Sequence, residues 1–273
     1  MEGQRVHLIR FAPAMLPAAW REPGPGRPRL PDVVKWFDRT PRDVTRQLLR
    51  QHRVPVVGDR VLLTDLRPET TAFVGQALAL ELELVAQAGR ALDGAPDLEA
   101  RVALAEVVRI HSSRASALAH ILESDDRDAA EAIAPYADAA RSLSQTGEGA
   151  DWYEQLLAIH VTSGLLSDFF VAASGGLPEE DRDAMLRALR DESAHAELVA
   201  LLRRAIEQTP RLSDRLAVWG RRLVGDALLQ MYLAVNGPDD SGRAVPSQPR
   251  LEPAFNDIVA SHTRRMDELG LTA

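Results

Sequence analysis

Apolar side chains recur at every third or fourth position from residue 69 to residue 269, and turn-forming residues interrupt this pattern at intervals. That spacing places the apolar side chains on one face of an α-helix, and no alternating strand pattern interrupts it. The pattern predicts long helices at 69–92, 97–123, 151–173, 178 to just before Pro210, 213–235 and 252–269. Because short turns join the first helix to the second and the third to the fourth, these four are expected to form a four-helix bundle. The last two helices are expected to pack outside it.

The first 68 residues have a different composition. Six of the 17 prolines lie within residues 1–31, which prevents a continuous helix and predicts an extended arm. A short helix is expected at 40–52 and a small β-hairpin at 54–63, turning at Gly58-Asp59. One helix with a hairpin has too few helices for a complete winged helix, so an appendage that packs on the rest of the protein is favoured. The expected division is therefore 1–68 and 69–273.

Charge and cysteine content exclude several classes of protein. The 273-residue chain has 32 basic and 40 acidic residues and a net charge of -8, which argues against binding to a phosphate backbone by the chain as a whole. Cysteine is absent, which excludes disulfides, thiolate catalysis and cysteine-ligated metal sites. No unbroken run of about 18 apolar residues exists, and the N-terminus lacks the layout of a signal peptide. A cytoplasmic protein without a membrane partner is therefore expected.

Polar residues interrupt the buried faces of the predicted bundle. His111 and Arg114 lie on the same stripe as Leu104, Val107, Leu118 and Ile121. Glu192 and His195 lie together on the buried stripe of the fourth helix, and His160 lies on that of the third. Buried charge without a partner costs several kcal/mol, so such residues must pair with one another or gather round a metal ion.

The turns predict which of these residues lie level in antiparallel helices. The midpoint of Glu83 and His111 is residue 97, inside the turn between the first two helices. The midpoint of His160 and His195 falls at Leu177-Pro178, as does that of Ser163 and Glu192. The polar residues of each hairpin are therefore expected to meet near the middle of the bundle. Two acidic residues near the start of the third helix, Asp151 and Glu154, are expected to cap it instead.

Several short motifs resemble a known family. From about residue 70 onward the chain is similar to the actinobacterial ferritin-like proteins that resemble the tRNA-modifying diiron hydroxylase (MiaE-like) family. The motifs that carry the resemblance are Asp151-Trp152-Tyr153-Glu154, Ser167-Asp168-Phe169-Phe170, Glu192-Ser193-Ala194-His195, Trp219-Gly220-Arg221-Arg222-Leu223-Val224-Gly225 and His262-Thr263-Arg264-Arg265-Met266. It implies a ferritin-like four-helix bundle with a diiron carboxylate centre, built from one Glu on each of two helices and Glu-x-x-His on each of the others.

This sequence departs from the family's set of metal ligands. By the resemblance, Glu83 matches the carboxylate of the first helix, and Glu192 with His195 matches the pair of the fourth. The pair of the second helix falls on His111 and Arg114, and the third carboxylate falls at about Ser163. Two carboxylates remain where a diiron site needs about four. An altered or lost diiron centre is therefore expected.

Three functional interpretations follow. In the first, Glu83, His111, His160, Glu192 and His195 hold a divalent metal ion such as iron, manganese or zinc; by the resemblance, the activity would be oxygen-dependent hydroxylation, and tRNA would be the implied partner. No other cofactor and no catalytic residue can be named.

In the second interpretation, Arg114 replaces the metal by pairing with Glu83 or Glu192, and the bundle is a scaffold or pseudoenzyme. In the third, the two C-terminal helices and the arm mediate self-association as a homodimer. The remaining histidines, including His262, are interpreted as ordinary surface or boundary residues.

Overall fold

The computed structural model describes residues 63, 68–124, 126–236 and 248–271. The chain divides into two units at residues 44 and 45, and every described residue belongs to the second. Within the described ranges the chain forms helices and turns without a strand, which confirms the all-α prediction. The helices are α2 (Thr70–Asp93), α3 (Leu98–Ser124), α4 (Ala129–Ile133), α5 (Ala137–Thr146), α6 (Trp152–Ala173), α7 (Glu179–Leu189), α8 (Ser193–Gln208), α9 (Arg211–Asn236) and α10 (Gln248–Glu268), with a 3₁₀ turn, η4 (Ser174–Gly176), between α6 and α7.

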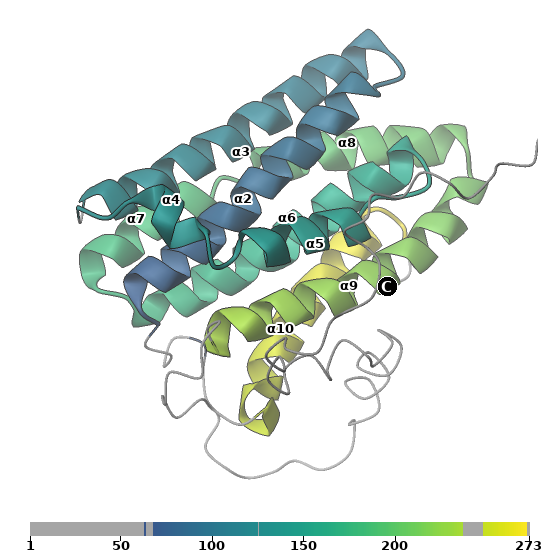
Figure 1. Cartoon of the computed structure of the whole chain (residues 1–273). Coiled ribbons are helices and arrows are strands. Elements are labelled where there is room, and N and C mark those ends of the chain that lie inside the picture. Colours follow the sequence, from purple (N-terminus) through teal and green to yellow (C-terminus); the bar gives the residue numbers. More distant parts are fainter. Residues whose placement is uncertain (1–62, 64–67, 125, 237–247, 272–273) are drawn as a thin grey trace, which may run out of the picture. The chain divides into compact units, whose positions relative to one another are not determined.

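Four of these helices close a bundle (Figure 1). Helix α2 packs on α3, α3 on α8, α8 on α6, and α6 again on α2. Helices α9 and α10 pack on the outer side of α6, and α4 and α5 cover α2. The predicted arm, short helix and hairpin lie outside the described residues, except Leu63, which is buried in the hydrophobic core.

Helix α6 is the central element of the core. Its residues Leu156, Leu157, Ile159, Leu165 and Phe169 are fully buried. The segment Trp152–Gly176 is long and apolar enough to cross a membrane, but 67% of its most apolar window is buried against the rest of the protein. Its apolar character is accounted for by its contacts with α2, α8, α9 and α10.

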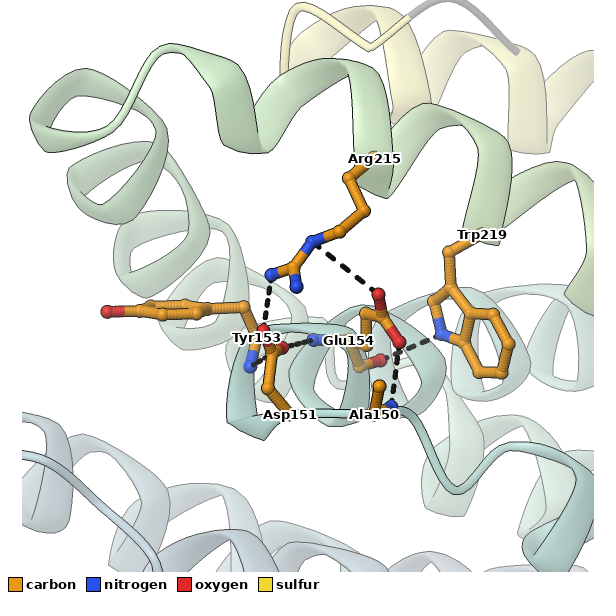
Figure 2. Close-up of polar contacts among 6 residues, drawn as sticks. All are labelled: Ala150, Asp151, Tyr153, Glu154, Arg215 and Trp219. Carbon is orange, nitrogen blue, oxygen red and sulfur yellow. Dashed lines mark hydrogen bonds and ion pairs between the residues drawn. The ribbon is translucent and has the colours of Figure 1, made fainter. Parts of the chain in front are cut away.

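The start of α6 is fixed by a reciprocal cap (Figure 2). The Asp151 carboxylate accepts hydrogen bonds from the backbone N–H groups of Tyr153 and Glu154, each at 3.0 Å. The Glu154 carboxylate in turn accepts from the N–H of Ala150 at 2.7 Å. Asp151 is thus the N-cap that satisfies two backbone donors left free by the first turn, and Glu154 holds the backbone of the residue that precedes this cap. The capping roles predicted for the two acids are confirmed.

The same cap ties α6 to two other helices. Arg215 of α9 forms ion pairs with both Asp151 and Glu154, and the indole N–H of Trp219 donates to the Glu154 carbonyl at 3.0 Å (Figure 2). On the other side, the indole N–H of Trp152 donates to the carbonyl of Ala91 in the last turn of α2, at 2.8 Å. The start of α6 is therefore tied to the last turn of α2 and to the N-terminal part of α9.

The prediction of a single fourth helix from residue 178 is wrong, because the helix is interrupted between α7 and α8 at residues 190–192. At the break, the Asp191 carboxylate accepts hydrogen bonds from the backbone N–H of Ser193, at 3.0 Å, and from its hydroxyl. Such local side-chain bonds compete with the hydrogen bonds of a continuous helix. The break leaves Glu192 exposed at the N-cap position of α8.

Two glycines of α2 provide a matched test of this packing. A Cβ atom on Gly75 would lie 2.4 Å from the carbonyl oxygen of Ala132 in α4, whereas one on Gly89 would meet nothing within 4 Å. We expect Gly75→Ala to lower the free energy of unfolding by about 1–3 kcal/mol, because α4 must shift. Gly89→Ala should raise it by up to about 1 kcal/mol through helix propensity. Urea unfolding measures both; equal effects would contradict the close packing of α4 on α2.

Candidate functional site

A buried acid and a buried imidazole meet between α2 and α3. The Nδ1 of His111 lies 2.7 Å from Oε2 of Glu81, and the two side chains are 0% and 7% exposed. Glu81 belongs to the stripe Val74, Ala77, Glu81, Leu84, Ala88 and Ala91, whose members are all buried. Helix periodicity therefore turns this carboxylate into the bundle.

Arg114, one turn after His111 on α3, places its guanidinium beside Glu81. Its Nη1 lies 3.5 Å from Oε1 of Glu81 and 3.3 Å from the hydroxyl of Ser167 on α6. Its Nη2 donates to the backbone carbonyl of Asp191, at the break between α7 and α8. The side chain is 6% exposed. One guanidinium thus connects α3 with α2, α6 and the α7–α8 junction.

The register predicted for α2 was wrong by two residues. Glu83 is partly exposed and lies 4.0 Å from Arg141 of α5, so the carboxylate that meets His111 and Arg114 is Glu81. The turn did not distinguish them, because the midpoint of residues 81 and 111 is 96, which lies in the same turn as 97. The strict three-and-four spacing through Leu84 and Ala88 is the sequence signal that favours Glu81.

The predicted partners of Arg114 therefore need correction. Arg114 pairs with neither Glu83 nor Glu192 but with Glu81 and with a backbone carbonyl. Glu192 is exposed because the helix break removes it from the buried stripe of α8. A continuous helix would have kept it one turn before His195 on the inner face.

A second polar cluster lies between α6, α8 and α10. The rings of His160 and His195 are stacked with centroids 4.5 Å apart, as expected from their equal distance from the connecting turn. His160 is 1% exposed, and neither of its ring nitrogens has a hydrogen-bond partner among the described residues. Burial lowers the pKa of His160 well below its usual value, and the nearby His195, Arg265 and His262 lower it further. His160 is therefore a neutral imidazole at pH 7.

Helix α10 contributes two residues that the sequence did not single out for a site. His262 is 2% exposed rather than at the surface, and burial followed by the charge of Arg265 lowers its pKa to about 4. Arg265 donates to the Asp168 carboxylate of α6 at 2.6 Å. A Cβ on Gly164 would lie 2.6 Å from the Arg265 side chain, so a larger residue there would require the guanidinium to shift where it crosses α6. The spacing of Gly164 and Asp168, one turn apart on α6, is the signal that could have indicated a crossing arginine.

The placement of these side chains decides whether they fit the metal centre that the resemblance implies. Among the described residues, no three His, Asp or Glu side chains are arranged so as to hold a metal ion. Of the five predicted ligands, the structure brings together His160 and His195, whereas Glu83, His111 and Glu192 each lie elsewhere. Glu81, the one carboxylate buried near mid-bundle in the part of the chain that the structure describes, already faces an imidazole and a guanidinium. This donor set does not fit a diiron carboxylate centre, which needs several carboxylates free to bind cations.

Exchanging each of two acids of α2 for its amide tests the corrected register. Glu81→Gln leaves the buried guanidinium of Arg114 without its counter-charge, so we expect the free energy of unfolding to fall by about 3 kcal/mol or more. Glu83→Gln removes a partly exposed partner of Arg141 and should cost less than about 1 kcal/mol. Urea denaturation of both variants measures the difference. If Glu83→Gln proved the more destabilising, the assignment of Glu81 would be wrong.

The second cluster predicts loss of stability in acid. In the unfolded chain both His160 and His262 titrate near pH 6.5, whereas their pKa values are lowered in the folded protein. The unfolded state therefore binds more protons between about pH 6.5 and 4. The contribution of these two histidines to the free energy of unfolding is therefore complete above pH 6.5. Below that pH it falls, by about 1.4 kcal/mol per pH unit for each histidine.

The dependence of unfolding on pH should be measured by urea titration between about pH 7 and 4.5. His262→Leu should make the slope shallower, whatever its effect on stability at neutral pH. Met266→Leu, a change at a buried residue of the same helix that does not titrate, should leave the slope as it is. An unchanged slope in His262→Leu would mean that folding does not lower the pKa of this imidazole.

A profile of a ferritin-like domain of actinomycetes matches residues 74–241, which is more than half of the chain and extends from the first turn of α2 to beyond α9. A search of curated proteins found no match. The match agrees with the closed bundle of α2, α3, α6 and α8. The chain therefore belongs to the ferritin-like domain family of actinomycetes.

Proposed function

We propose that this ferritin-like protein is a cytoplasmic, non-catalytic scaffold in which a buried ion-pair network occupies the region where diiron carboxylate proteins hold metal. The observation that carries this proposal is the contact of Arg114 and His111 with a single carboxylate, Glu81. A fixed positive charge at this position opposes the binding of a second cation, because like charges in a poorly solvated interior repel strongly.

The network has a structural role of its own. Removing one partner of a buried ion pair is strongly destabilising, because the other charge is then left in the interior without a counter-charge. Here Arg114 also donates a hydrogen bond to the carbonyl of Asp191, which the helix break leaves outside helical hydrogen bonding. The pair thus holds together the broken fourth helix and the first hairpin, which is the role a metal ion would have in a bundle with intact ligands.

The alternative is a metal-dependent, oxygen-activating hydroxylase, acting on tRNA by resemblance to the MiaE-like family or on a small molecule. One observation favours it: both ring nitrogens of His160 are buried and without a hydrogen-bond partner among the described residues, and His195 lies against the ring. Neutral imidazole nitrogens bind iron, manganese and zinc. Arg265, whose charge lowers the pKa of His160, argues against a cation there.

Metal content distinguishes the two functions. The purified protein should be loaded with Fe(II) without oxygen, separated from free metal by gel filtration, and analysed for iron, manganese and zinc by mass spectrometry. The scaffold predicts well under one ion per chain. It also predicts a thermal unfolding midpoint that neither added metal nor a chelator changes, because a ligand stabilises a fold only if it binds it.

One or two ions per chain, with a higher unfolding midpoint, would overturn the scaffold proposal. His195→Ala would then locate the site. Loss of the bound metal in this variant would place it at the His160–His195 cluster and favour the hydroxylase. Glu83→Gln serves as the control, since Glu83 lies against Arg141 and away from that cluster.

A further inference from the structure

The junction between α7 and α8 interrupts a sequence that is otherwise suited to one continuous helix. Residues 190–192 are Arg, Asp and Glu, and they include neither the Gly nor the Pro that usually ends a helix. The buried side chains of Ala188 in α7 and Val199 in α8 are eleven residues apart, which is about three turns of a continuous helix. The periodicity of the buried face therefore passes through the break without a change of phase.

The backbone on either side of Asp191 stays close to a helical conformation. Arg190 has φ −82° and ψ −2°, and Glu192 has φ −91° and ψ 6°. A rotation of about 40–50° at each ψ angle would bring both residues to the values of an α-helix. Helices α7 and α8 also pack on the same two neighbours, α3 and α6, so a continuous helix would occupy the same place in the bundle.

The carbonyl group of Asp191 has different partners in the two arrangements. In a continuous helix it would accept the backbone N–H of His195, four residues later. In this structure it accepts a hydrogen bond from Nη2 of Arg114, whose side chain is buried. The carboxylate of Asp191 supports the break as well, because it accepts from the backbone N–H of Ser193 at 3.0 Å. A continuous helix would direct that N–H to the carbonyl of Leu189 instead.

We propose that this junction is a hinge with two states, the break described here and a continuous helix, and that the bond from Arg114 to the Asp191 carbonyl holds it in the broken state. The hinge controls where Glu192 lies. This side chain is exposed at the break, whereas in a continuous helix it would lie one turn before His195 on the buried face. Closing the hinge would therefore carry a carboxylate toward the stacked rings of His160 and His195. The proposal concerns the backbone and does not depend on metal binding.

Amide hydrogen exchange of residues 191–195 in the full chain tests the hinge. The double variant Glu81→Gln with Arg114→Met frees the Asp191 carbonyl without leaving a buried charge unpaired. We expect these amides to exchange about tenfold more slowly than in the wild type, because they gain helical hydrogen bonds. If Arg114 only stabilised the junction, its loss would speed exchange instead. Glu83→Gln with Arg141→Met, an Arg–Glu pair between α2 and α5, is the matched control and should leave exchange at 191–195 unchanged.

A second variant decides the question if circular dichroism shows that the double variant does not fold. Asp191→Ala removes the carboxylate that binds Ser193 while Arg114 and Glu81 stay in place, and alanine favours a helix more than aspartate does. It should also slow exchange at residues 191–195. Exchange that is unchanged or faster in every folded variant would overturn the hinge. Slower exchange in Asp191→Ala, with no change in a folded double variant, would overturn the role given to Arg114.

Discussion

The Arg114 guanidinium is the charge on which the arrangement of the bundle depends. It is buried at the level where α2, α3, α6 and the α7–α8 junction meet, and it finds a carboxylate on one side and a freed backbone carbonyl on the other. Each of these contacts is needed. Without Glu81 the charge has no counter-ion, and without Arg114 the carbonyl of Asp191 loses its donor. The helix break, the register of α2 and the position of Arg114 therefore depend on one another.

In the proposed scaffold, the ferritin-like fold is kept without the metal centre that the resemblance implies. A bundle of four helices needs its buried polar positions neutralised, but a metal is one solution and an ion pair is another. Here the carboxylate of α2 is shared by His111 and Arg114, and the acid of the fourth helix, Glu192, has moved out to solvent. The fold then persists on its apolar packing, which centres on α6. This arrangement supports the proposed scaffold function. The observation that argues most against it is the buried ring of His160, whose nitrogens have no hydrogen-bond partner among the described residues.

The helices outside the bundle are integrated into it by polar contacts as well as by packing. Arg215 and Trp219 of α9 hold the first turn of α6, and Arg265 of α10 crosses α6 at Gly164 to reach Asp168 (Figure 2 shows the first of these contacts). The buried His262 lies on the same helix, α10. Helix α10 thus completes a histidine cluster that the four-helix bundle alone would leave partly uncovered.

The sequence by itself determined the helical class, the ends of α2, α3 and α6 to within a few residues, the caps at Asp151 and Glu154, and the meeting of His160 with His195. Each follows from local rules: period, turn residues and equal distance from a turn. It did not determine which glutamate of α2 faces inward, because residues 81 and 83 imply midpoints one residue apart in the same turn. The break at Asp191 was decided by tertiary structure, since the guanidinium of Arg114, distant in the sequence, donates a hydrogen bond to the carbonyl that the break exposes. The burial of His262 was decided in the same way, because the face that α10 turns toward α6 depends on packing between segments about a hundred residues apart.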